Sequence, residues 1–282
     1  MKTQIVGLLA ETSIHPGASQ SSGIIDLPVA REEATDYPVV PGSSLKGALL
    51  GLSRETWQDE KERMLKPERD RIFGQSDNAG ALLVSDARLL LLPIRSLSSA
   101  YKWITCPHLL ERYVRDKQRA DHEAATVTLP DIACGKYICA DKTTDKNTLF
   151  LEERQFDHKE GLLDDLVNTI KPLIHHEWTR DRLAKQLIVL HDDDFTWFAR
   201  YGLAVQARNA LDEKKTSKNL WYEESIPADA LFYALLAERG PDAIEPVKQL
   251  FKDHPYLQAG GNETVGMGWF AVTFPGTKED PV

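Results

Sequence analysis

The sequence predicts an α+β fold in which strands and helices alternate along 282 residues. Residues 3–12 are rich in Ile, Val and Leu, as expected of a buried strand. Ser43 or Ser44 can cap a helix that runs to about Arg63, with apolar residues at helical spacing. Residues 205–226 hold two strand-like segments around a polar tip, which favours a long β-hairpin. Neither a Rossmann nor a P-loop signature is present.

The other elements follow from the same patterns. Residues 13–42 are expected to form a long loop, and loops of that length in compact domains are often functional or mobile. The rest are expected as a strand over 80–93 with a polar interruption, a helix over 105–116, a loop-rich stretch over 117–147, a half-exposed strand over 149–156, helices over 162–174 and 180–187, a strand over 188–190, helices over 195–199, 229–238 and 242–252, and a glycine-rich turn into a last strand over 257–274.

Charge is distributed unevenly along the chain. The formal net charge is −9, which by itself argues against a general nucleic-acid binder. Up to residue 119 the chain has 16 basic and 15 acidic residues, whereas the remainder has 18 basic and 28 acidic residues. An anion-binding surface should therefore draw mainly on the first half.

The cysteines and the hydropathy pattern bear on the cellular compartment. The three cysteines have no C-x-x-C spacing, which disfavours a structural zinc site, and an odd number suits a reducing cytoplasm. No run approaches the roughly 18 apolar residues of a membrane helix. The apolar start, residues 5–10, is too short for a signal peptide and is followed at once by Glu11.

A Pro-Gly-Ser-Ser-Leu-Lys turn over residues 41–46 is a candidate anion site. The N–H groups at a helix start point outward and the helix dipole favours an anion; Ser43 and Ser44 add donors and Lys46 adds a charge. The alternative is an ordinary serine-capped helix with a solvated lysine.

Asp26 is a lone carboxylate in a loop that begins with the small residues 16–23. Such a group can bind a divalent metal ion or accept a proton near a phosphate that is being cleaved. RNA supplies its own nucleophile, the 2′-hydroxyl, so few protein groups are required. His15 could donate to a phosphate or act as an acid or base. The alternatives are an Asx-turn aspartate and a histidine at a strand end.

Two further segments could contact a phosphate chain. The glycine-rich loop, residues 260–268, allows a phosphate chain to approach its backbone closely, with Gly260, Gly261, Asn262 and Thr264 as candidate contacts. Arg208 and the tip lysines Lys214, Lys215 and Lys218 are candidates on the hairpin, although charged hairpin tips are usually just solvated.

Strand alternation should send Glu223 and Glu224 to opposite faces, one toward Asp26 and the other toward water. Asp192–Asp194 could hold a metal ion or cap the next helix.

Taken in order, several segments resemble the backbone RAMP subunit of the type III-B CRISPR Cmr effector complex. They are His15–Gly17, Gly23–Pro28, Arg31–Glu32, Thr35–Gly47, Ile72–Gly74, Ser85–Arg88, Trp103–Pro107, Leu220–Glu224 and Gly260–Gly268. Residues 117–200 contribute little to the resemblance.

The resemblance implies a single domain, residues 1–282, with a ferredoxin-like (RRM-like) RAMP palm, a catalytic loop over 13–42, an insertion over 117–200 and a hairpin thumb over about 205–226. It implies a subunit that stacks with copies of itself and with other Cmr subunits along CRISPR RNA in antiviral defence. Target RNA would be cut at regular intervals in a metal-dependent way, with Asp26 as the catalytic aspartate. Glu223 or Glu224 would complete the shell of a Mg²⁺ or Mn²⁺ ion, with Glu224 preferred. The helix start and the glycine-rich loop would contact the guide backbone. Alternatives are a non-cutting scaffold of the same fold and a small-molecule enzyme with a preformed pocket.

Overall fold

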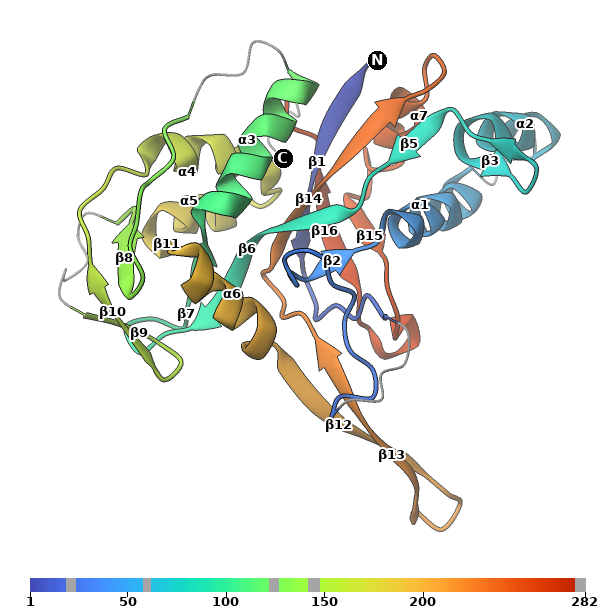
Figure 1. Cartoon of the computed structure of the whole chain (residues 1–282). Helices are drawn as coiled ribbons and strands as arrows, with labels where there is room; N and C mark the ends of the chain where they lie inside the picture. Colours follow the sequence, from blue (N-terminus) through green and yellow to red (C-terminus); the bar gives the residue numbers. More distant parts are fainter. Residues whose placement is uncertain (19–23, 58–61, 122–126, 142–147, 277–282) are drawn as a thin grey trace.

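The computed structural model describes residues 1–18, 24–57, 62–121, 127–141 and 148–276 (Figure 1). Its main feature is a twelve-stranded mixed sheet with helices packed against it, so the predicted α+β class is confirmed. None of the helices among the described residues combines the length and the hydropathy of a membrane span.

One half of the sheet has the ferredoxin-like arrangement. Four antiparallel strands lie in the order β16, β1, β14, β6, and the chain visits them as β1, α1, β6, β14, α7 and β16. The bounds are β1 (Thr3–Ala10), α1 (Gly42–Thr56), β6 (Ala87–Arg95), β14 (Leu231–Glu238), α7 (Ile244–Gln249) and β16 (Trp269–Thr273). Short elements beside it are β2 (Val39–Val40), α2 (Glu62–Phe73), β3 (Gly74–Gln75), β4 (Asn78–Ala79), β5 (Leu82–Val84), β15 (Tyr256–Gln258) and the 3-10 turn η2 (Glu263–Val265).

The other half of the sheet comes from the part of the sequence that follows β6 and precedes the predicted hairpin. The C-terminal part of β6 pairs with β7, and the sheet continues through β11, β8, β10 and β9. The bounds are β7 (Tyr101–Thr105), α3 (Pro107–Ala120), β8 (Lys136–Cys139), β9 (Thr148–Leu151), β10 (Arg154–His158), α4 (Asp164–Ile170), the 3-10 turn η1 (Lys171–Leu173), α5 (Glu177–Gln186), β11 (Leu187–Leu190) and α6 (Asp192–Tyr201).

Both faces of the central strands are buried. Alternate residues of β1 belong to different apolar clusters, with Val6 and Leu8 on one face and Ile5 and Leu9 on the other. The first cluster includes residues of α1, α6 and α7, and the second includes residues of α3, α4 and α5. Leu45, Ala48, Leu49 and Leu52, which are apolar residues at helical spacing in α1, contribute to the first cluster or pack against it.

A two-stranded hairpin projects away from this body (Figure 1). We call it the thumb hairpin; it consists of β12 (Ala204–Leu211) and β13 (Ser217–Ser225), antiparallel with Arg208 opposite Trp221. The hairpin predicted over 205–226 is thus confirmed. Most of its residues are exposed except at the end of β13, where residues 223–225 are buried.

The helix predicted over residues 229–238 is wrong. The segment forms β14, a central strand paired with β1, β5 and β6. Residues 231–237 are all buried, because both faces of this strand are covered. The alternation that marks a half-exposed strand is therefore missing, and its Ala and Leu content resembles that of a buried helix.

Other predicted elements differ in their bounds. The half-exposed strand over 149–156 is two strands, β9 and β10, joined by a turn in which Glu152 has a φ of 49°. Residues 117–147 include β8, so the described part of that stretch is not only loop. The helix expected up to Arg63 ends at Thr56 and a second helix, α2, starts at Glu62. Pro41 precedes α1 without a side-chain cap, so the predicted serine cap is also wrong.

Candidate functional site

At the base of the thumb hairpin, the predicted catalytic loop (residues 13–42, called the catalytic segment below) contacts the rest of the chain. Leu27 forms a parallel bridge with Glu223, and Ile14 forms an antiparallel bridge with Ile226. The backbone bonds Leu27 N–H to Tyr222 O (3.1 Å) and Glu224 N–H to Leu27 O (3.0 Å) attach this segment to β13 through an isolated bridge. The expected long loop over 13–42 is therefore fixed in its second part; residues 19–23, part of its small-residue run, lie outside the described residues.

Asp26 lies at this junction with its side chain exposed. Its Oδ2 accepts a hydrogen bond of 2.7 Å from the backbone N–H of Tyr222 on β13. Among the described residues, Oδ1 has no hydrogen-bond partner. The neighbouring Tyr222 and Leu220 are exposed on the hairpin. Asp26 is thus an oriented, solvent-accessible carboxylate bonded to the backbone of an exposed part of the hairpin.

Glu224 is buried and fully engaged. Its Oε1 accepts from Arg31 Nη2 at 2.7 Å, and its Oε2 accepts from the backbone N–H of Val29 at 3.0 Å. Arg31 also donates to the carbonyls of Asp36 (2.8 Å) and Ala199 (2.7 Å), so it joins three segments. With both oxygens occupied, Glu224 is poorly placed to bind a metal ion; its role as a ligand stays a prediction.

Glu223 is also buried, so the prediction that one of this acidic pair faces water is wrong. Its Oε1 accepts from Asn262 Nδ2 and lies 3.5 Å from Arg208 Nη2. Arg208 Nη2 lies 3.3 Å from Met267 Sδ as well. These contacts connect the hairpin to the glycine-rich loop. Glu223 is covered by contacts with Asn262 and Arg208, and Glu224 by contacts with Arg31 and Val29, so strand alternation exposes neither acid.

His15 lies beneath the glycine-rich loop and is buried. Its Nδ1 is 2.8 Å from Glu224 O, which requires a proton on Nδ1 because a carbonyl only accepts. Its backbone carbonyl accepts from Gly261 N–H at 2.8 Å. Gly260 has a φ of 103°, and a Cβ there would lie 3.0 Å from His15 O. Glycine is thus required at position 260 by the fold. The catalytic role of His15 stays a prediction.

The start of α1 already holds a protein carboxylate. Asp86 Oδ1 accepts from Gly42 N–H at 2.7 Å, and Lys46 Nζ donates to Leu82 O at 3.3 Å. Ser43 is exposed and Ser44 half-buried. Ser44 and Gly260 line one groove of about 380 Å³ between α1 and the glycine-rich loop. The α1 wall of this groove also includes Gly47, Ala48 and Gly51, so a ligand backbone could approach the helix closely.

The tip of the thumb hairpin is held by local hydrogen bonds, two of them accepted by the Asp212 side chain. Asp212 Oδ1 accepts from Lys214 N–H (2.9 Å) and Thr216 N–H (2.8 Å), and Lys215 has a φ of 60°. Lys214, Lys215 and Lys218 are exposed. Thr264 in the glycine-rich loop is exposed too.

A second ion pair links the catalytic segment to α3. Glu32 accepts two bonds from Arg112 on α3, at 2.6 and 2.8 Å. Burial by itself would raise the pKa of Glu32, but the hydrogen bonds from Arg112 and Thr35 and the charge of Arg112 together lower it.

The structure therefore gathers Asp26, His15, Glu223, Glu224, Arg208 and Asn262 at the thumb base. Sequence reasoning gave no role to Arg31 or Asp86, although both lie in segments that carried the family resemblance. Both residues could have been found as ionisable residues within the segments that carry the family resemblance.

This architecture, a ferredoxin-like sheet with an inserted hairpin, matches a known class of proteins. The model of the RAMP superfamily matches residues 8–271. The chain is 33% identical to the CRISPR system Cmr endoribonuclease Cmr4 of Pyrococcus furiosus, over 97% of this chain and 96% of that protein. The chain therefore belongs to the RAMP superfamily, and the resemblance and the RAMP fold expected from the sequence are confirmed.

Solved structures agree with this assignment. The crystal structure of oligomeric Cmr4 from Pyrococcus furiosus gives a TM-score of 0.76 at 30% identity and covers 98% of both chains. A chain in the cryo-EM structure of type III-B Cmr-beta bound to cognate target RNA gives 0.74 at 21% identity, over 97% of both chains. At that identity the second match shows the fold alone.

Proposed function

We propose that this protein is the CRISPR RNA-binding backbone subunit of a type III-B effector complex and cleaves target RNA that pairs with the guide. The observation that carries the proposal is similarity along the whole chain, in sequence and fold, to a protein named Cmr endoribonuclease Cmr4. We place it in the cytoplasm, in keeping with three cysteines that are all free.

The thumb base is the proposed cleavage site. Asp26 is the accessible carboxylate there, and its bond from Tyr222 N–H fixes it to the hairpin. In this proposal it accepts the proton of the RNA 2′-hydroxyl or holds a metal ion beside the phosphate. The hydroxyl oxygen attacks the phosphorus, the bond to the 5′-oxygen breaks, that oxygen takes up a proton from water to leave as a 5′-hydroxyl, and a 2′,3′-cyclic phosphate remains.

The residues present fit a hard divalent ion such as Mg²⁺ or Mn²⁺ only in part. Asp26 offers an exposed oxygen, whereas Glu224 has both oxygens engaged. A Mg²⁺ ion commonly keeps several waters and is bound through one or two carboxylates plus substrate phosphates, so a single protein ligand is sufficient. Such an ion would neutralise charge that develops on the phosphate.

Guide binding is assigned to the groove between α1 and the glycine-rich loop. The small residues of the groove allow a sugar–phosphate backbone to approach closely. Lys46 and Ser43 lie near the start of α1, next in sequence or close to Ser44, which lines the groove. Because the net charge is −9, only a local stripe of basic residues can attract the RNA phosphates. Binding through such contacts is salt-sensitive. The thumb hairpin projects from the body with both strands largely exposed, so in this proposal it reaches the RNA held by the next copy in a stack.

The proposal is tested by size-exclusion chromatography of the chain with and without CRISPR RNA, with bound RNA measured from the absorbance ratio. A shift to large RNA-containing particles is expected, and complementary RNA added with Mg²⁺ should be cut at regular intervals. Assembly without cutting would support a non-cutting scaffold. No RNA-dependent assembly would contradict the proposal and favour a small-molecule enzyme.

A further inference from the structure

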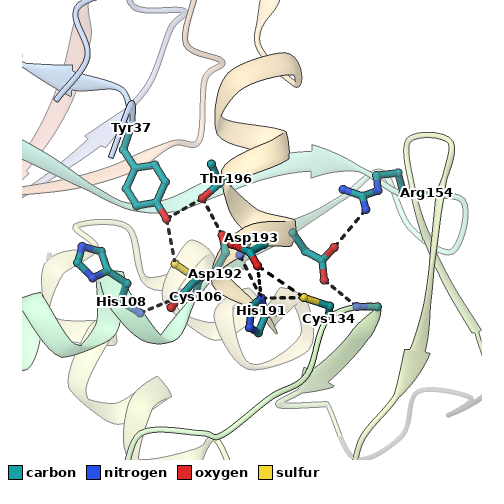
Figure 2. Close-up of polar contacts among 11 residues, drawn as sticks. Tyr37, Cys106, His108, Cys134, Arg154, His191, Asp192, Asp193 and Thr196 are labelled. Carbon is teal, nitrogen blue, oxygen red and sulfur yellow. Dashed lines mark hydrogen bonds and ion pairs between the residues drawn. The ribbon is translucent and has the colours of Figure 1, made fainter. Parts of the chain in front are cut away.

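Three metal-ligating side chains of different chemistry meet away from the thumb base, at the start of α6 (Figure 2). Cys134 precedes β8, His191 precedes α6, and Asp193 lies in the first turn of α6. Cys134 Sγ is 3.1 Å from His191 Nδ1 and 3.8 Å from Asp193 Oδ2, and His191 Nδ1 is 3.6 Å from Asp193 Oδ2. One atom from each side chain therefore faces a common point.

These separations suit a tetrahedral zinc ion. Bonds of about 2.3 Å to sulfur and about 2.0–2.1 Å to nitrogen or oxygen place neighbouring ligand atoms roughly 3.3–3.6 Å apart. Of the three separations, 3.6 Å lies within that range, 3.1 Å is slightly shorter and 3.8 Å slightly longer. Sulfur, imidazole nitrogen and carboxylate oxygen are also the donor atoms that Zn²⁺ takes in proteins.

Buried contacts hold the two segments in this arrangement. Asp194, which is buried, accepts from Gly135 N–H at 2.7 Å and from Arg154 Nη2 at 3.2 Å (Figure 2). Asp192 accepts from His108 N–H at 3.0 Å. Two of the three consecutive aspartates thus have structural partners, whereas the third, Asp193, has a side chain that is 83% exposed.

Two simpler roles leave part of this cluster unexplained. His191 Nδ1 accepts from Asp193 N–H at 3.1 Å and so caps α6, but a cap requires neither the thiol nor the carboxylate. Cys134 is a poor candidate for a reactive thiol, because reactive cysteines lie in electropositive surroundings and the Asp193 carboxylate lies 3.8 Å from Cys134 Sγ.

We propose that Cys134, His191 and Asp193 bind one Zn²⁺ ion, with water at the fourth position. On binding, the Cys134 thiol releases its proton to solvent, and the Nδ1 lone pair passes from the Asp193 N–H to the metal. The ion would tie the segment before β8 to α6. Because α6 ends at Tyr201 and β12 begins at Ala204, the site steadies the helix that leads into the thumb hairpin. Its nitrogen and sulfur ligands separate it chemically from the oxygen site proposed at Asp26.

The test uses the purified full chain without RNA, so its result does not depend on the proposed function. The metal-free protein is titrated with Co²⁺ as a spectroscopic substitute, and then with Zn²⁺ in competition. One equivalent of Co²⁺ should give a thiolate-to-cobalt charge-transfer band and visible bands of tetrahedral cobalt, and Zn²⁺ should remove both. Zn²⁺ should also raise the melting temperature.

Variants identify the ligands. Cys134→Ser should abolish the charge-transfer band, and Cys134→Ser and Asp193→Asn should each weaken Zn²⁺ binding by at least about tenfold, since even outer partners of a metal site account for roughly 10–100-fold. Asp165→Asn is the matched control, because Asp165 is likewise an exposed aspartate in the first turn of a helix, α4. It should bind like the unmodified chain. The absence of a thiolate band in the unmodified chain, or equal binding by Cys134→Ser, would overturn the proposal.

Discussion

The base of the thumb hairpin buries charged groups, whereas its tip exposes them. At the base, Glu223 and Glu224 are buried and receive bonds from Asn262, Arg31 and the Val29 backbone. At the tip, Asp212 forms the turn through local backbone bonds, and the lysines point into solvent. Buried ionic contacts cost stability when broken, while exposed ones contribute little. The base should therefore determine whether the hairpin is held in place, and the tip should determine what it binds.

The largest expected effect comes from breaking the ion pair at the base. Arg31→Ala leaves the Glu224 carboxylate buried without its cation, which should lower the free energy of unfolding by about 3 kcal/mol. The measurement is urea unfolding of the purified chain. The control is Arg95→Ala, which removes the exposed partner of Glu152 and should cost less than about 1 kcal/mol. Equal costs for the two variants would contradict the contrast between buried and exposed charge.

A pH experiment probes the second anchor of the same segment. The folded chain lowers the pKa of Glu32, so the ionised carboxylate contributes stability that is present above its unfolded pKa of about 4.3 and is lost as pH falls through the folded value. Glu32→Gln should cost about 1–2 kcal/mol at pH 7. Its difference from the unmodified chain should shrink as the pH falls below that unfolded pKa.

The exposed pair of Glu68 with Arg71 serves as the reference for this titration. Glu68→Gln should change the free energy of unfolding much less than Glu32→Gln at pH 7. A Glu32→Gln cost that stays constant down to acid pH would show that lost packing, and not charge, explains it.

The smallest stability effect is expected at the tip. Replacing residues 212–219 with a short glycine-containing turn should change the free energy of unfolding by no more than about 0.5 kcal/mol, because these residues are exposed and bond only within the hairpin. Assembly on CRISPR RNA or the spacing of cuts should nevertheless change. Normal assembly with normal spacing would place the thumb function elsewhere in the chain.

Sequence reasoning succeeded where an element carries a simple signal. Solvent on one side of α1 imposes the helical spacing of its apolar residues, β1 has the Ile, Val and Leu content of a buried strand, and a polar tip separates the two strands of the thumb hairpin. It failed at β14, which is covered on both faces, and at the Glu152 turn, where a glutamate adopts a positive φ. At the site, Asp26 could be singled out as a lone acid in a loop of small residues. The burial of both Glu223 and Glu224 could not be predicted, because it depends on the distant residues Arg31 and Asn262.

We propose that Asp26 takes part in RNA cleavage and does not hold the fold or the guide. The most direct measurement is cleavage of complementary RNA by the assembled complex with Mg²⁺ or Mn²⁺, with target binding measured in chelator, for Asp26→Asn. Asp212→Asn is the matched control, because Asp212 is also an exposed aspartate that accepts backbone N–H bonds on the same hairpin. We expect Asp26→Asn to bind guide and target normally and to lose cleavage, and Asp212→Asn to retain both. Normal cleavage by Asp26→Asn would contradict the account, and a parallel loss of binding would make Asp26 a structural residue.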